Sequence, residues 1–167
     1  MARDYAPMSS ASTLIKIADA AAARGALDEA IHGYAQAISQ GHHPAHERLC
    51  HAQTLSGRSK EALDCCKAAL RVLPESSFLH QLEGQTALEQ NMPQRSASAY
   101  MRAHQLNPQS MDILLNIGIA LQMARRPAEA THWLERSSDL APGSDAHVQL
   151  ARALEAHGNS LLGAQRP

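Results

Sequence analysis

The sequence has few aromatic residues, no excess of either charge and no long apolar run. Phe, Tyr and Trp together make up 3% of the 167 residues, whereas alanine is plentiful. This composition favours helices that pack closely through small side chains over a β-sandwich. The net charge of −1 provides no basic surface for nucleic acid or an acidic membrane. No apolar segment is long enough to predict a membrane span.

Cysteine is also scarce. The chain has Cys50, Cys65 and Cys66, an odd number with two of them adjacent, which is not typical of a disulfide framework. Residues 1–10 contain no apolar segment of a secretory signal. We therefore expect a reducing, cytoplasmic location, in which Cys50 packs as a small unpaired hydrophobic residue.

An internal repeat dominates what the sequence does contain. Pro74, Pro108 and Pro142 are spaced 34 residues apart, and the same interval separates Gly84 from Gly118. Segment 111–144 shows the underlying unit. Its first half has apolar residues at helical spacing, a short turn follows, and Pro127 then begins a second helix, where its missing N–H costs nothing. The repeat predicts helices, and no strands, at about residues 11–24, 27–40, 44–56, 59–72, 77–90, 94–106, 111–124, 127–140 and 145–157.

These spacings resemble the tetratricopeptide repeat (TPR) family, which has a 34-residue helix–turn–helix unit. Small residues such as Gly84 and Gly118 in first helices, Ala130 in a second helix and closing prolines carry the resemblance. It implies an all-α, right-handed superhelix of about four repeats and a C-terminal capping helix. The expected organisation is an N-terminal segment 1–10, a TPR domain 11–158 with repeats 11–42, 43–76, 77–110 and 111–144 and a capping helix 144–158, and a tail 159–167.

The segment HHPAHERLCH, residues 42–51, is rich in histidine. His46 and Glu47 fit the beginning of a metalloprotease HExxH motif, but Cys50 stands where the second histidine is needed. A zinc site formed by Cys50 and nearby histidines is conceivable. We favour packing roles, because His80 and His147 occupy the place of His46 in other repeats. We predict no metal site, no cofactor and no catalytic residue; sequence motifs of hydrolases and nucleotide-binding proteins are also absent.

The resemblance further implies a concave groove lined by the first helices, where a protein or extended peptide would bind. The groove residues expected from the alignment are Lys16, Arg48, Phe78, Gln81, Leu82, Gln85, Leu88, Leu115, Asn116, Ile119, Met123 and Arg152, with Val148 beside the last of them. An apolar strip within this set favours a partner. The strip could instead be covered by the N-terminal segment, the C-terminal tail or another copy of the chain, as in a homo-oligomer.

Lys16, Arg48 and Asn116 resemble parts of the carboxylate clamp of some TPR domains. Asp19 stands where that clamp has an asparagine, and its charge argues against carboxylate binding. The resemblance therefore implies a non-enzymatic adaptor or scaffold, in a narrower version a secretion-type chaperone. The alternative is the N-terminal TPR module of a larger transferase, of the sulfotransferase or O-GlcNAc transferase type.

Overall fold

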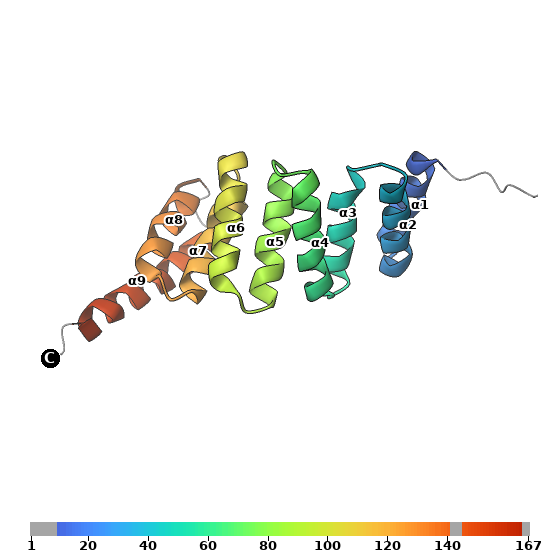
Figure 1. The fold of residues 1–167 in the computed structure, drawn as a ribbon. Coiled ribbons are helices and arrows are strands. Elements are labelled where there is room, and N and C mark those ends of the chain that lie inside the picture. The colour runs from blue at the N-terminus through green and yellow to red at the C-terminus, as the bar shows by residue number, and fades with distance from the viewer. Residues whose placement is uncertain (1–9, 141–144, 165–167) are drawn as a thin grey trace, which may run out of the picture. The chain divides into compact units, whose positions relative to one another are not determined.

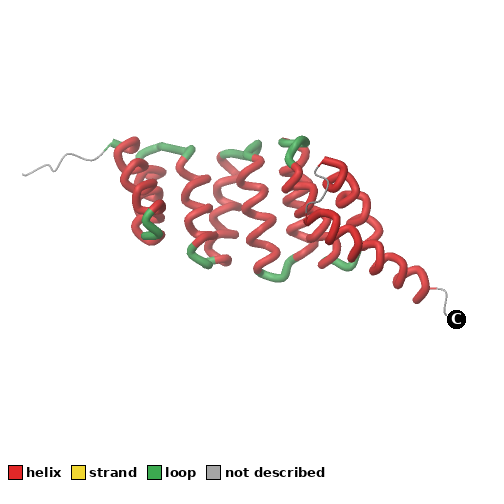
Figure 2. The backbone as a smooth tube through the Cα atoms, turned by 180° about the vertical axis from the view of Figure 1, so that it is seen from behind, coloured by secondary structure: helices red, strands yellow, loops and turns green. Residues whose placement is uncertain are grey.

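The computed structural model describes residues 10–140 and 145–164, which form helices joined by short turns and contain no strand (Figure 2). In chain order the helices are α1 Ala11–Ala23, α2 Leu27–Ser39, α3 Ala45–Leu55, α4 Ser59–Val72, α5 Ser77–Glu89, α6 Pro93–Leu106, α7 Met111–Met123, α8 Pro127–Leu140 and α9 Asp145–Ala164 (Figure 1). The bounds of α1–α8 confirm the predicted helices to within one residue. Helix α9 is longer than predicted and continues to Ala164, into the segment where the sequence predicts a tail. The closing Pro142 of the last repeat lies outside the described residues.

Local sequence explains where the helices begin. Ser10 and Ser76 are N-caps, and each side-chain oxygen accepts a hydrogen bond from the backbone N–H three residues later. Pro93 and Pro127 are the first residues of α6 and α8, where a backbone N–H has no partner within the helix.

The turn inside each helix pair has one backbone conformation. Each turn has one residue with positive φ, at the same place in the repeat. In the four pairs this residue is Gly25, Gly57, Asn91 and Arg125. The following N–H closes the turn on the preceding helix, as in the 2.9 Å bond from Arg126 N to Leu121 O. This is the hydrogen bond of a Schellman motif, which commonly ends a helix. The turn therefore reverses the chain after a first helix of 11–13 residues.

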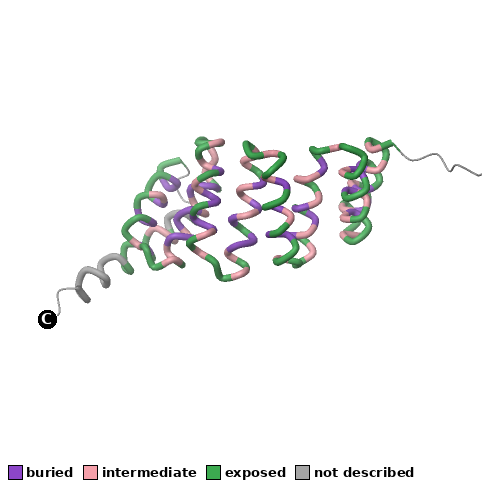
Figure 3. The backbone as a smooth tube through the Cα atoms, in the orientation of Figure 1, coloured by how far each residue is buried: buried purple, intermediate pink, exposed green. Residues whose placement is uncertain are grey.

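The chain divides into two compact units, Met1–Pro74 and Glu75–Pro167, so that unit 1 holds α1–α4 and unit 2 holds α5–α9. The boundary falls between the second and third predicted repeats. In unit 1 a core of alanines surrounds Tyr34, with Leu49 of α3 packed against it. In unit 2 the core includes Tyr100, Ile117, Leu121 and Leu134. Figure 3 shows buried residues alternating with exposed ones along these helices.

Within a pair the two helices come close at a small residue of the first helix. A Cβ atom added at Gly84 would lie 2.7 Å from the Tyr100 ring of α6, and one added at Gly118 would overlap Leu134 of α8. In the α1–α2 pair, Ala18 holds the same place, and its Cβ would lie 2.8 Å from one added at Gly33. Any larger side chain at these places would push the paired helices apart.

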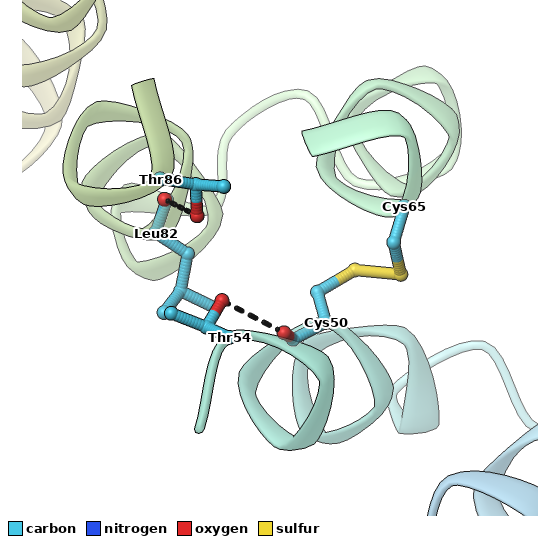
Figure 4. Close-up of a disulfide and its surroundings, with 5 residues drawn as sticks. All are labelled: Cys50, Thr54, Cys65, Leu82 and Thr86. Atoms are coloured by element: carbon cyan, nitrogen blue, oxygen red, sulfur yellow. Dashed lines mark hydrogen bonds between the residues drawn. A yellow bond between two sulfur atoms is a disulfide. The ribbon is translucent and has the colours of Figure 1, made fainter. Parts of the chain in front are cut away.

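The α3–α4 pair has cysteines at this contact. Cys50 and Cys65 form a disulfide, with Cα atoms 5.5 Å apart, within the range that a disulfide spans (Figure 4). The prediction of an unpaired Cys50 is therefore wrong. Cys50 and Cys65 occupy the places of Ala18 and Gly33, where the helices of a pair nearly touch. Cys66 is fully buried in the core.

The helix contact can be tested with Gly118→Leu. The added side chain has no space against Leu134, so we expect it to destabilise the chain by about 1–3 kcal/mol, although leucine favours helix more than glycine does. Urea unfolding followed by circular dichroism measures this change. Ala128→Leu, on the exposed side of α8, is the matched control and should change stability little. Equal stabilities of the two variants would contradict this account of the helix pair.

The disulfide can be tested by reduction. Its cysteines are 15 residues apart in sequence, and closing a loop of that length stabilises a protein by about 3 kcal/mol. We expect a reducing agent to lower the urea midpoint of the wild-type chain but not that of Cys65→Ser. Thiol titration in denaturant without reductant should find only Cys66, and three reactive thiols would contradict the pairing.

Candidate functional site

The predicted groove residues of unit 2 lie on the first helices α5, α7 and α9. On α5, Phe78 is 40% exposed and Gln85 is also exposed, while Gln81 and Leu88 are half-buried. Leu82 is only 4% exposed, so its prediction as an exposed groove residue is wrong. The reason is its place on the helix, beside the buried residues Leu79 and Thr86.

On α7 the predicted residues divide into a base and an exposed end. Leu115 is half-buried and packs on the core cluster of unit 2, as Leu88 of α5 does. Asn116 and Ile119 are half-buried, and Met123 at the end of α7 is 47% exposed. Helix α9 lies beside α7, and a hydrogen bond joins them: Gln122 Nε2 donates to the backbone oxygen of Gln149 at 2.7 Å.

Helix α9 adds Val148, which is 53% exposed, and the exposed Arg152. We call the accessible set the unit 2 face. It consists of Phe78, Gln81, Gln85, Asn116, Ile119, Met123, Val148 and Arg152. Apolar side chains of this face thus lie on all three first helices, and amide groups lie among them on α5 and α7.

Two amide groups of the unit 2 face are held by long hydrogen bonds within their own helix. Gln81 Nε2 donates to Ser77 Oγ at 3.5 Å, and Gln85 Nε2 donates to Glu89 Oε1 at 3.4 Å. Bonds of this length are at the weak limit of the usual range. A ligand that offers a backbone carbonyl at about 2.9 Å would therefore compete well for either amide.

The two predicted residues of unit 1 lie in a different environment. Lys16 is exposed on α1. The side chain of Arg48 on α3 forms an ion pair with Asp19 of α1, with 3.2 Å between Nε and Oδ1. Tyr34 of α2 donates its hydroxyl hydrogen to the same Oδ1 at 2.7 Å. Arg48 therefore ties the two first helices of unit 1 together and is already neutralised by Asp19.

Comparison with known proteins supports the repeat at the level of structure. No protein-family model and no curated protein matches the sequence. A structure of MamA superposes with a TM-score of 0.83 at 19% identity, covering 89% of this chain and 82% of that one. YrrB, described as a TPR protein with an unusual peptide-binding site, gives 0.81 at 20% identity, covering 92% and 80%. A TPR protein from Parabacteroides merdae gives 0.80 at 17% identity, covering 89% and 60%.

The chain has the TPR fold. These identities are too low to transfer a ligand or partner, so the binding residues must be judged from this chain alone. The TPR alignment placed the residues of the unit 2 face on the first helices, but could not tell that Leu82 is covered. It also missed the Tyr34–Asp19–Arg48 network. The available signal was the opposite charge of Asp19 and Arg48 on the first helices of successive repeats.

Within the described part of the chain, which includes the histidine-rich segment 42–51, no three potential metal ligands come together. Cys50 is bonded to Cys65 and offers no thiolate to a metal. The rings of His43 and His46 are parallel, with centroids 6.3 Å apart. Burial and the neighbouring His43 both lower the pKa of His46. The equivalent His147 has no described side chain.

Trp133 of α8 is partly buried and packs against the core of unit 2. Its ring contacts His104 and His132 edge-on and lies 5.1 Å below the Arg136 guanidinium. No helix in the described residues is both long enough and apolar enough to cross a bilayer. The expected reducing compartment rested partly on unpaired cysteines. Cys50 and Cys65 instead form a disulfide, and disulfides persist mainly in oxidising compartments.

The two buried tyrosines predict a loss of stability at alkaline pH. Burial, the hydrogen bond to Asp19 and the charge of Asp19 raise the pKa of Tyr34 to about 12. Burial, followed by the charge of Glu89, raises the pKa of Tyr100 to about 12. An unfolded tyrosine ionises near pH 10, so this contribution is complete below pH 10 and is lost as the pH rises to 12.

We expect the free energy of unfolding to fall across this pH range. Urea unfolding at each pH measures the fall, which should be smaller in Tyr100→Phe. Absorbance difference spectra of Tyr34→Phe and Tyr100→Phe against the wild-type chain identify the two phenols. Ionisation of both near pH 10 in the folded chain would contradict the structure.

Proposed function

We propose that the chain is a non-enzymatic adaptor that binds an extended peptide segment of a protein along the unit 2 face. The observation that carries this proposal is the combination of exposed apolar side chains on α5, α7 and α9 with accessible amide side chains on α5 and α7. Phe78, Met123 and Val148 are 40%, 47% and 53% exposed. None of the three belongs to the core cluster of unit 2.

The chemistry of the unit 2 face fits a peptide. An extended peptide presents backbone N–H and C=O groups along its length, and the side-chain amides of Gln81, Gln85 and Asn116 both donate and accept hydrogen bonds. Apolar side chains of the peptide would cover Phe78 on α5, Ile119 and Met123 on α7, and Val148 on α9. Repeat proteins provide such extended surfaces, on which one segment contacts several helices.

Charge adds a secondary preference. Arg152 is exposed on α9 and favours an acidic group at that end of the peptide. Arg48 is neutralised by Asp19, so we do not assign it the acid-selecting role that the sequence suggested. A chaperone that holds an extended segment would use the same contacts as an adaptor, and the experiment below tests both.

The test is a selection from a displayed library of random peptides on the 167-residue chain, followed by affinity measurement on the selected peptides. We expect peptides with at least two apolar residues. Met123→Lys should weaken them by about 10-fold or more, because one buried apolar side chain is worth about 1.5–3 kcal/mol. Lysine at the end of a helix suits the helix dipole, so α7 should remain folded.

Leu140→Lys is the matched control. Leu140 is also the last residue of its helix, is 55% exposed, and lies on the second helix α8. The same peptides should bind this variant with unchanged affinity. Failure to select any peptide, or loss of binding in Leu140→Lys with retention in Met123→Lys, would show that the unit 2 face is not the binding site.

A further inference from the structure

Helix α9 packs on unit 2 as a first helix of the repeat does. Ala153 is fully buried and Leu150 packs on the core cluster of unit 2. On α7 the corresponding residues are Ile117 and Ala120, which are fully buried in the same cluster as Tyr100 and Ala103 of α6. We call these residues the stacking side, because they pack on the preceding helix pair.

The adjacent side of a first helix contacts the second helix of its own pair. On α1, α3, α5 and α7 the small residues of this pairing side are Ala18, Cys50, Gly84 and Gly118, all of which are buried. On α9 the equivalent residue is Ala151, which is exposed. Leu154, one turn further on the same side, is 50% exposed, whereas its counterpart Leu121 on α7 is fully buried.

No second helix folds back on α9 within the described residues. The other first helices end after 11–13 residues at a turn with a left-handed residue. Helix α9 instead continues as one helix for 20 residues, to Ala164. In repeat arrays a helix side that no further helix covers is normally polar, which keeps the array soluble. The pairing side of α9 has alanine and leucine instead.

We propose that two copies of the chain associate through this side, with the α9 helices antiparallel about a twofold axis. Ala151 of one copy then lies opposite Leu154 of the other, and Leu154 of the first lies opposite Ala151 of the second. A twofold interface requires such reciprocal contacts, and one small and one large residue supply them here. The contact has the same form as Gly118 against Leu134 and Gly84 against Tyr100 within the pairs of unit 2.

The spacing of Ala151 and Leu154 makes the pairing side complementary to itself, so a second copy of the chain fits it. Ala151 and Leu154 are three residues apart and thus on one side of the helix. In an antiparallel pair of identical helices, this spacing places the alanine of each copy opposite the leucine of the other. Helix α9 of each copy thus takes the place that a second helix occupies beside the other first helices.

Sedimentation equilibrium of the 167-residue chain over about 1–500 µM tests the association, since a single helix pair gives a small interface of modest affinity. We expect a reversible dimer. Leu154→Glu should raise its dissociation constant by about 100-fold or more, because two leucines leave the interface and two like charges enter it. Leu55→Glu is the control: Leu55 is 59% exposed at the end of α3, and this variant should dimerise normally.

A monomer throughout this concentration range would overturn the proposal. A dimer that persists in Leu154→Glu would place the interface elsewhere and also overturn it. Circular dichroism should show that Leu154→Glu keeps its helices, because Leu154 is half exposed. The register is tested by oxidising a mixture of Ala151→Cys and Leu154→Cys chains. Antiparallel pairing predicts that disulfides form mainly between the two different variants, and crosslinking mainly within each variant would contradict it.

Discussion

The close approach of two helices at one small side chain is the constraint on which each helix pair depends. At Gly84 and Gly118 the partner side chain occupies the space that a Cβ atom would need. The large residues Tyr100 and Leu134 can be buried only because the facing residue is so small. In a chain with so few aromatics, small and large residues interlock at these contacts to fill the space between paired helices. The disulfide forms at the same contact in the α3–α4 pair, because only there do both helices have a cysteine at it.

Much of the fold could be predicted because its determinants are local and repeated. Prolines at helix starts and small residues at helix contacts recur every 34 residues. A helix boundary that is ambiguous in one repeat can therefore be assigned from the others. The length of α9 could not be predicted in this way, because residues 159–167 do not continue the pattern that marks the turns after the other first helices. Ile17 shows a similar limit: it corresponds to the fully buried Ile117 of the fourth repeat, yet it is 58% exposed. Its counterpart Leu49 packs on the preceding helix pair, and no pair precedes α1 in the described residues.

The candidate site was predictable only in part, because neighbours decide which side chains are accessible. The alignment gives the correct helices for the unit 2 face but treats Leu82 as equivalent to Asn116. The first is buried and the second half-buried. Contacts between particular side chains were harder to predict from the sequence. In the sequence Arg48 is a candidate ligand contact and Asp19 an argument against one, whereas in the structure Asp19 binds both Arg48 and Tyr34. The cysteines were misjudged for the same reason, since counting them says nothing of which helix contacts they occupy.

Helix α9 brings together the requirements of packing, association and binding. With 3.6 residues per turn, its side chains divide among separate sides that are roughly a quarter turn or more apart. Leu150 and Ala153 serve stacking, Ala151 and Leu154 the proposed pairing, and Val148 and Arg152 the unit 2 face. Association through the pairing side would therefore leave both unit 2 faces accessible. A dimer of this kind holds two peptide sites in one assembly, so a partner with two suitable segments would bind more tightly than one segment alone, without any additional contact.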